Sequence, residues 1–100
     1  MKMSQKAQIV LRILEELGAT DLEHKANIYD IMEKLDKTNL QEWYPKESKD
    51  TLFSIKIEMT QKSISTTIAA LIRGGKVAKT NPEATKVGTL MRNLRSYYLK

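Results

Sequence analysis

The segment Thr60–Val77, which reads TQKSISTTIAALIRGGKV, has the clearest helical pattern in the chain. Its apolar residues recur at the spacing of one helix face: Ile64, Ile68, Leu71 and Ile72. Thr60 is a good N-cap, and Gly74-Gly75 supplies a left-handed stop after Arg73, a cation suited to the last helical turn. We therefore predict a helix fixed by its apolar face, with Ile68 at the centre of that face and fully buried.

Two further amphipathic helices are expected before this segment. The first has Ser4 as its N-cap and Gly18 after its last turn, and its apolar face comprises Ile9, Val10, Ile13, Leu14 and Leu17. The second begins at about Asn27, and its apolar stripe comprises Ile28, Ile31, Met32 and Leu35. Residues 19–26 connect the two helices and have room for a short strand.

Residues 36–59 form a separate polar region that contains the only Trp, Trp43, next to Tyr44. We expect Trp43 to anchor this region to the core. From Phe53 to Met59, apolar residues alternate with polar ones, and this period of two favours a strand. A helix over 50–58 is the alternative interpretation.

The C-terminal part, residues 76–100, is expected to contain strands at 76–80 and 95–99. The intervening residues 81–94 allow two interpretations. Asn81-Pro82 is a good helix start, and apolar residues follow at helical spacing. Because both flanks have strand character, we favour a β-hairpin in which 81–94 is the long loop.

Composition excludes several classes of function. The chain has 100 residues, no Cys and one His, so a disulfide scaffold, a thiolate metal site and a cysteine nucleophile are excluded. Neither a catalytic constellation nor a metal, cofactor or small-molecule site is visible, and we predict that the protein is not an enzyme. No apolar run is long enough to span a membrane, and the amphipathic start does not resemble a signal peptide. The expectation is a single domain over 1–100 with a cytoplasmic location.

The net charge of +5 is distributed unevenly. Residues 1–58 contain 9 Lys/Arg and 11 Asp/Glu, whereas residues 59–100 contain 8 Lys/Arg and a single acid, Glu83. A surface with one predominant sign of charge attracts partners of the opposite sign. The basic C-terminal region therefore points to a phosphate backbone as its partner.

The pattern from Thr60 to Val77 resembles the recognition helix of winged helix-turn-helix domains. In that family a glycine leads from the helix into the first strand of the wing, as Gly75 does here. The ending Arg95-Ser96-Tyr97-Tyr98-Leu99 resembles the returning wing strand. The resemblance implies a mainly α, α+β fold of three or four helices with a hairpin wing over 76–100, and it leaves 36–59 as an insertion or extra element.

The same resemblance implies binding to double-stranded DNA, with the third helix in the major groove and the wing on the backbone. The outward helix face has no acid between Thr60 and Arg73, and its Gln and Lys side chains can read adenine and guanine. The residues expected to contact DNA are Thr60, Gln61, Lys62, Ser63, Ser65, Thr66, Arg73, Lys76, Lys79, Lys86, Arg92 and Arg95.

The expected role is a transcriptional regulator that acts by occupying its site, as a homodimer formed through residues 4–17 or 36–59. A protein-interaction module is the main alternative, with the acidic first half, Trp43 and Tyr44 as its surface. A replication or recombination accessory factor would make the same DNA contacts.

Overall fold

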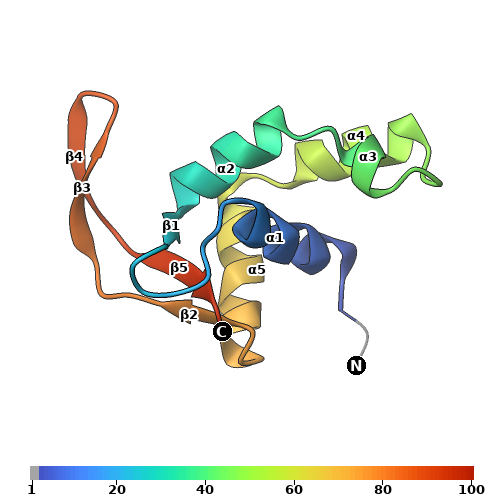
Figure 1. Cartoon of the computed structure of the whole chain (residues 1–100). Coiled ribbons are helices and arrows are strands. Elements are labelled where there is room, and N and C mark those ends of the chain that lie inside the picture. The colour runs from blue at the N-terminus through green and yellow to red at the C-terminus, as the bar shows by residue number, and fades with distance from the viewer. Residues whose placement is uncertain (1–2) are drawn as a thin grey trace.

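The structure, a computed structural model, describes residues 3–100 and has an α+β fold in which about half of the residues are helical (Figure 1). The elements are α1 (Gln5–Glu16), β1 (Ala26–Asn27), α2 (Ile28–Lys37), α3 (Leu40–Trp43), α4 (Lys49–Glu58), α5 (Gln61–Arg73), β2 (Val77–Lys79), β3 (Glu83–Val87), β4 (Leu90–Leu94) and β5 (Ser96–Leu99). The α+β class is as expected. The described residues contain five helices instead of three or four, because residues 36–59 contribute α3 and α4.

Helices α1, α2 and α5 pack against one another and enclose most of the core. The largest fully buried side chains come from these helices and from β2: Ile9, Val10, Ile13, Leu14, Ile31, Ile64, Ile68 and Val77. Ile68 is 1% exposed, as expected from its central place on the apolar face of α5. The core thus fixes the rotation of α5 about its own axis.

The expected helix ends are confirmed. The side chain of Ser4 accepts a hydrogen bond from the Ala7 amide, and that of Thr60 accepts one from the Ser63 amide. Asn27 forms a reciprocal capping box with Asp30, in which each side chain accepts from the other residue's amide. Gly75, with φ of 75°, turns the chain out of α5 and toward β2.

The strand favoured for residues 53–59 is wrong, because residues 53–58 belong to helix α4. The Ser48 hydroxyl caps the helix by accepting from the Thr51 amide. A helical spacing coexists with the period of two: Leu52 and Met59 are buried and Ile55 packs against the core. Burying these three residues on one face outweighs the alternation and leaves Phe53 and Ile57 in solvent.

Segment 36–59 is attached to the helical core at defined points. The Lys56 ammonium donates hydrogen bonds to the backbone oxygens of Asp36 (3.1 Å) and Thr38 (2.9 Å), at the C-terminal end of α2. Trp43 is half-buried against the core, and the Arg12 guanidinium lies 4.7 Å from its ring centroid. The expected anchoring role of Trp43 is therefore confirmed.

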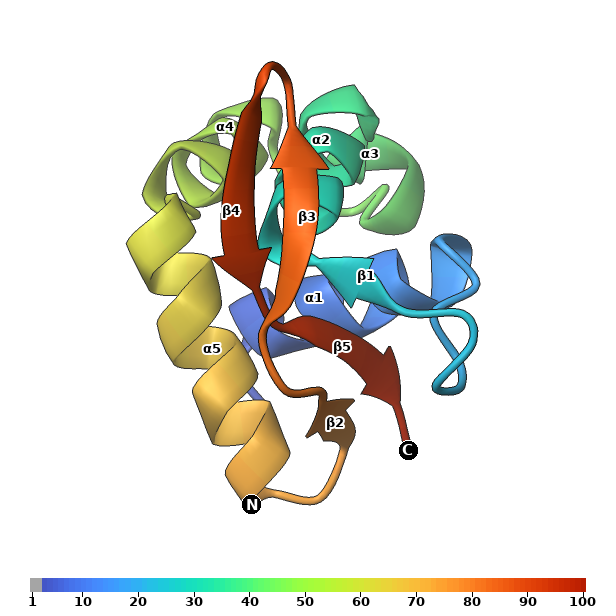
Figure 2. The ribbon, with the colours of Figure 1, turned by 90° about the vertical axis from the view of Figure 1, so that its left-hand side faces the viewer.

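The strands form a three-stranded antiparallel sheet in the order β1-β5-β2 and a separate two-stranded hairpin, β3-β4. In the sheet, Tyr97 of β5 lies opposite Ala26 of β1 and Lys79 of β2. The expected pairing of 76–80 with 95–99 is confirmed. The hairpin follows β2, stands in front of α2 and α4 in Figure 2, and leads into β5.

Residues 81–94 are neither a long loop nor a helix, because most of them form β3 and β4. The register pairs Glu83 with Leu94 and Val87 with Leu90, so the two strands are joined by Gly88-Thr89. Gly88 has φ of 63°, a left-handed conformation that suits a tight hairpin turn. A helix over the same residues would have carried this glycine in its interior, where it is destabilising.

Candidate nucleic-acid interface

Helix α5 exposes the polar face expected from the sequence. Its exposed residues include Gln61, Lys62, Ser65, Thr66 and Ala69. On the opposite face Ile64, Ile68 and Leu71 are buried, while Ile72 is half-buried. Only Met59 and Thr60 separate α4 from α5, and the buried Met59 fixes this turn in the core. The exposed face therefore begins directly after a tight helix–helix connection.

The hydroxyl groups of α5 do not all point outward to a partner. Thr66 donates to the Lys62 backbone oxygen (3.0 Å), and Thr67 donates to that of Ser63 (2.9 Å). Thr60 is occupied as the N-cap, where it accepts from the Ser63 amide at 3.3 Å. Thr60 and Ser63, both expected at the interface, are thus part of the cap, and Thr66 has only its oxygen lone pairs to offer a partner.

The cations of residues 59–100 extend from α5 into the hairpin. Lys62 lies in the first turn of α5 and Arg73 in its last turn, Lys79 ends β2, Lys86 is in β3, and Arg92 is in β4. Within the described range 3–100, none of the Lys or Arg side chains of this segment forms an ion pair. In this part of the chain, these cations are therefore not paired with a carboxylate.

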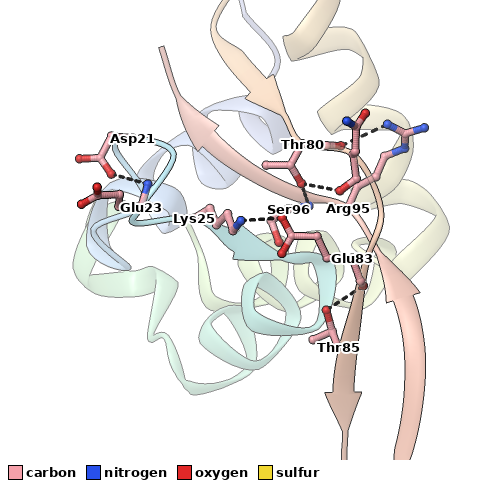
Figure 3. A network of polar contacts seen from close by, with 9 residues as sticks. Asp21, Glu23, Lys25, Thr80, Glu83, Thr85, Arg95 and Ser96 are labelled. Atoms are coloured by element: carbon pink, nitrogen blue, oxygen red, sulfur yellow. Dashed lines mark hydrogen bonds and ion pairs between the residues drawn. The ribbon is translucent and has the colours of Figure 1, made fainter.

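The only acid of this basic segment is paired with a residue from the other half of the chain. The Glu83 Oε1 atom lies 2.8 Å from the Nζ atom of Lys25, a residue that precedes β1 (Figure 3). This ion pair links the start of β3 to the α1–β1 connection. It also partly compensates the negative charge of Glu83, which would otherwise repel a phosphate near the start of β3.

The base of the hairpin is held by a compact set of hydrogen bonds (Figure 3). The buried Thr80 donates its amide to the Ser96 backbone oxygen (2.9 Å), and its Oγ1 accepts from the Ser96 amide (3.0 Å). The Thr80 hydroxyl itself donates to the Asn81 backbone oxygen at 3.0 Å. Arg95 Nη1 donates to the Thr80 backbone oxygen at 3.1 Å. Arg95, expected to contact DNA, therefore also fixes the hairpin base.

Thr80→Val is expected to lower the free energy of unfolding by about 1–3 kcal/mol, because the isosteric side chain leaves the Ser96 amide without its acceptor. Thr85→Val is the matched control. Its hydroxyl donates only to the Glu83 backbone oxygen on the hairpin surface, so the change should stay within about 0.5 kcal/mol. Denaturant titrations measure both values, and equal effects would show that Thr80 does not fix the hairpin base.

Tyr97 and Tyr98 are both half-buried in the central strand β5. Tyr97 packs against the core, and its removal from water raises the pKa of its hydroxyl, an effect that the nearby Arg95 charge opposes. The phenol therefore stays neutral at physiological pH. Tyr97 therefore acts as a packing residue between the sheet and the core.

Four large apolar side chains, two on α4 and two at the hairpin tip, are exposed, which was not predicted from the sequence. Phe53 and Ile57 on α4 are 66% and 60% exposed, and Leu90 and Met91 at the hairpin tip are 58% and 65% exposed. The sequence feature that could have indicated the exposure of Leu90 and Met91 is their position directly after Gly88-Thr89, the turn between β3 and β4. The apolar residues of 81–94 also fit a helical spacing, which suggested a buried face instead.

Neither metal-ligand clusters nor bilayer-spanning helices occur in the described part of the chain. Within residues 3–100, no three His, Asp or Glu side chains come together in a way that could hold a metal ion. Across the same range, no helix combines the length and the apolar character needed to cross a membrane.

No family model matches this chain, and no match was found among curated proteins or solved structures. A functional assignment therefore depends on the chain's own residues. The features that bear on it are the exposed face of α5, the cations of residues 59–100 and the hairpin fixed at its base.

Proposed function

We propose that the chain is a winged helix-turn-helix protein that binds double-stranded DNA and regulates transcription by occupying its site. The observation that carries the proposal is α5, which buries an apolar face and exposes a polar face that contains no acid. A helix entering the major groove needs such a face, because base edges offer hydrogen-bonding groups and the flanking phosphates repel carboxylates.

The order of the elements supports the winged-helix assignment. A strand precedes α2, α5 leads into β2, and the β3–β4 hairpin intervenes between β2 and the central strand β5. In this assignment α4, the turn Met59-Thr60 and α5 form the helix-turn-helix, and the hairpin is the wing. Helices α2 and α3 then precede the helix-turn-helix.

The proposed contacts divide into two classes. Gln61 and Lys62, in the first turn of α5, read bases in the major groove, and Ala69 leaves room for a thymine methyl group. Lys79, Lys86 and other wing cations bind phosphates and set the register on the duplex. Specificity then resides in α5, and most of the affinity resides in the wing.

A homodimer on a two-fold site is part of the proposal, since a single small module binds DNA weakly. Of the two segments expected to mediate it, 36–59 is favoured. Phe53 and Ile57 are spaced by one helical turn on α4, so they form an exposed apolar stripe.

The test is a selection of preferred sequences from random duplex DNA. The wild-type protein is expected to enrich one motif with two-fold symmetry. Gln61→Ala or Lys62→Ala should relax the preference at individual base pairs, by about 1–3 kcal/mol for each base that the side chain reads. Lys79→Ala is the control, because loss of a phosphate contact weakens binding to all sequences alike. Failure to enrich any sequence would contradict the proposal.

A protein-interaction module is the second candidate, and one observation favours it. The exposed stripe of Phe53 and Ile57 could bind a partner protein instead of a second copy. Trp43 and Tyr44, expected to form that surface, are half-buried against the core and are less suited to it. Binding to random duplex DNA that does not weaken as salt increases, or no binding at all, would favour this candidate.

A further inference from the structure

We propose that the tip of the β3–β4 hairpin enters the minor groove of duplex DNA and inserts an apolar side chain between base pairs, which bends the duplex. The inference rests on the proposed DNA-binding function and goes further, because it assigns the tip a role distinct from phosphate binding. The residues concerned are Leu90 and Met91, which are exposed and do not pack in the core.

The first argument is the exposure of these two side chains. Leu90 and Met91 leave more than half of their surface in water, although burial of such side chains is favourable. They are adjacent in sequence and follow the Gly88-Thr89 turn, at the end of the hairpin furthest from the sheet (Figures 1 and 2). Two large apolar side chains exposed at a protruding tip, one on each face of the ribbon, are placed to contact a partner.

The second argument is the arrangement of charge behind the tip. Met91 lies directly opposite Lys86 across the hairpin, so these two side chains share one face of the ribbon. Leu90 shares the other face with Arg92, two residues further along β4. Each apolar side chain at the tip is therefore accompanied by a cation on its own face.

This pattern matches the chemistry of a minor groove that has been opened by a kink. The floor of the groove offers stacked bases, between which leucine and methionine can insert, and its two walls are lines of phosphate. A two-stranded ribbon with its side chains fits the major groove, whereas the undistorted minor groove is only about 6 Å wide, so the tip can enter only where a kink has widened the minor groove. Lys86 and Arg92, on opposite faces of the ribbon, are placed to meet opposite walls.

The third argument is that the hairpin can transmit force to the duplex. Its base is held by the Thr80–Ser96 pair of hydrogen bonds, by Arg95 and by the Lys25–Glu83 ion pair (Figure 3). Kinking and unstacking require free energy, and a tip on an unrestrained loop would yield instead of the duplex.

An anionic membrane is an alternative partner for the hairpin tip, because it also has apolar groups behind a negatively charged surface. The structure favours DNA as the partner. Two side chains provide little apolar area for a bilayer, where even one complete acyl chain gives only marginal binding. The basic residues also continue along β2 to α5, whose polar face has no large apolar residues suited to a lipid surface.

The experiment uses the duplex obtained in the selection, with 2-aminopurine placed at successive positions and fluorophores at the two ends. The wild-type protein should raise 2-aminopurine emission at one step beside the wing and shorten the end-to-end distance, as expected for a kink of about 20–90°. Leu90→Ser combined with Met91→Ser should abolish both signals yet keep the affinity within about tenfold, because phosphate contacts dominate binding.

Leu22→Ser is the matched control, because Leu22 is as exposed as Leu90 but lies in the α1–β1 connection. It should leave emission, bending and affinity unchanged. Thermal melting of each variant checks that the fold is intact, which is expected since all three positions are exposed.

The outcomes separate the two proposals. Two results would overturn the insertion of Leu90 or Met91 between base pairs but leave the DNA-binding function standing. One is salt-dependent binding to the duplex without unstacking, and the other is unstacking that persists in the double variant. Absence of binding to any duplex would overturn both. The wild type could instead bind vesicles that contain phosphatidylserine, and the double variant could fail to do so. This result would assign the tip to a membrane and overturn its insertion into DNA.

Discussion

Ile68→Ala is expected to lower the free energy of unfolding by about 2–5 kcal/mol. Ile68 lies at the centre of the apolar face of α5, is 1% exposed and packs within the core that also contains Ile64 and Leu71. The substitution removes buried carbons and leaves a cavity that the surrounding helices can fill only in part. The total free energy of unfolding of a domain is about 5–15 kcal/mol, so the variant should melt at a clearly lower temperature.

Thr66→Ala is the control on the opposite face of the same helix. Thr66 is exposed and its hydroxyl donates to the Lys62 backbone oxygen, so its loss should change stability by less than about 0.5 kcal/mol. If the Thr66 oxygen accepts a hydrogen bond from DNA, affinity should fall by about 1 kcal/mol. Paired melting and binding measurements check both variants. A stable Ile68→Ala together with a destabilised Thr66→Ala would contradict the observed orientation of α5.

The second large effect is expected on binding. Replacing Lys76, Lys79 and Lys86 together with alanine should reduce affinity for duplex DNA by roughly two to three orders of magnitude at 0.1 M salt. Each lysine bound to a phosphate releases counterions, so each replacement should lower the salt slope by about 0.9. The three side chains are exposed and form no ion pair within residues 3–100, so the fold should be unaffected.

A matched variant removes the same charge elsewhere. Lys34, Lys46 and Lys49 lie in the N-terminal half, outside α5 and the hairpin, and form no ion pair within residues 3–100. Their joint replacement with alanine should leave the salt slope nearly unchanged. Titrations at several salt concentrations give the slopes of both triple variants. Equal reductions in affinity would mean that binding reflects net charge alone and that the hairpin has no special part in it.

Local patterns in the sequence predicted the elements whose stability is local. The caps Ser4, Asn27 and Thr60 were predictable because each N-cap interaction involves residues only three positions apart. The buried face of α5 was predictable because helical periodicity selects which side chains meet the core. The exposed face of the candidate interface followed directly, as its complement.

Segment 53–59 shows where local pattern was insufficient. The alternation from Phe53 to Met59 was genuine, but a strand would have needed a neighbouring strand to satisfy its backbone, and β1, β5 and β2 pair only with one another in the observed sheet. The helix satisfies its own backbone and places Leu52 and Met59 in the core. Two periodicities coexisted in the sequence, and packing selected one.

In the candidate site, the hairpin also had some features that local sequence patterns predicted and others that they did not. The basic character of residues 76–100 and the pairing of their outer strands were evident from composition and β-propensity. Two contacts were not evident from the sequence: that of Arg95 with the Thr80 backbone and that of Lys25 with Glu83. They join residues 15 and 58 positions apart. No short-range pattern encodes such contacts.

By itself the sequence determined the caps, the buried face of α5, the acid-free polar face opposite it and the separation of charge between the two halves. These properties depend on residue type and on spacings of a few residues, which the chain carries without folding. The tertiary structure alone decided that 49–58 is helical, that Arg95 holds the hairpin base and that Leu90 and Met91 extend into solvent. Each of these depends on which distant elements meet, and the competition for a single core decides that.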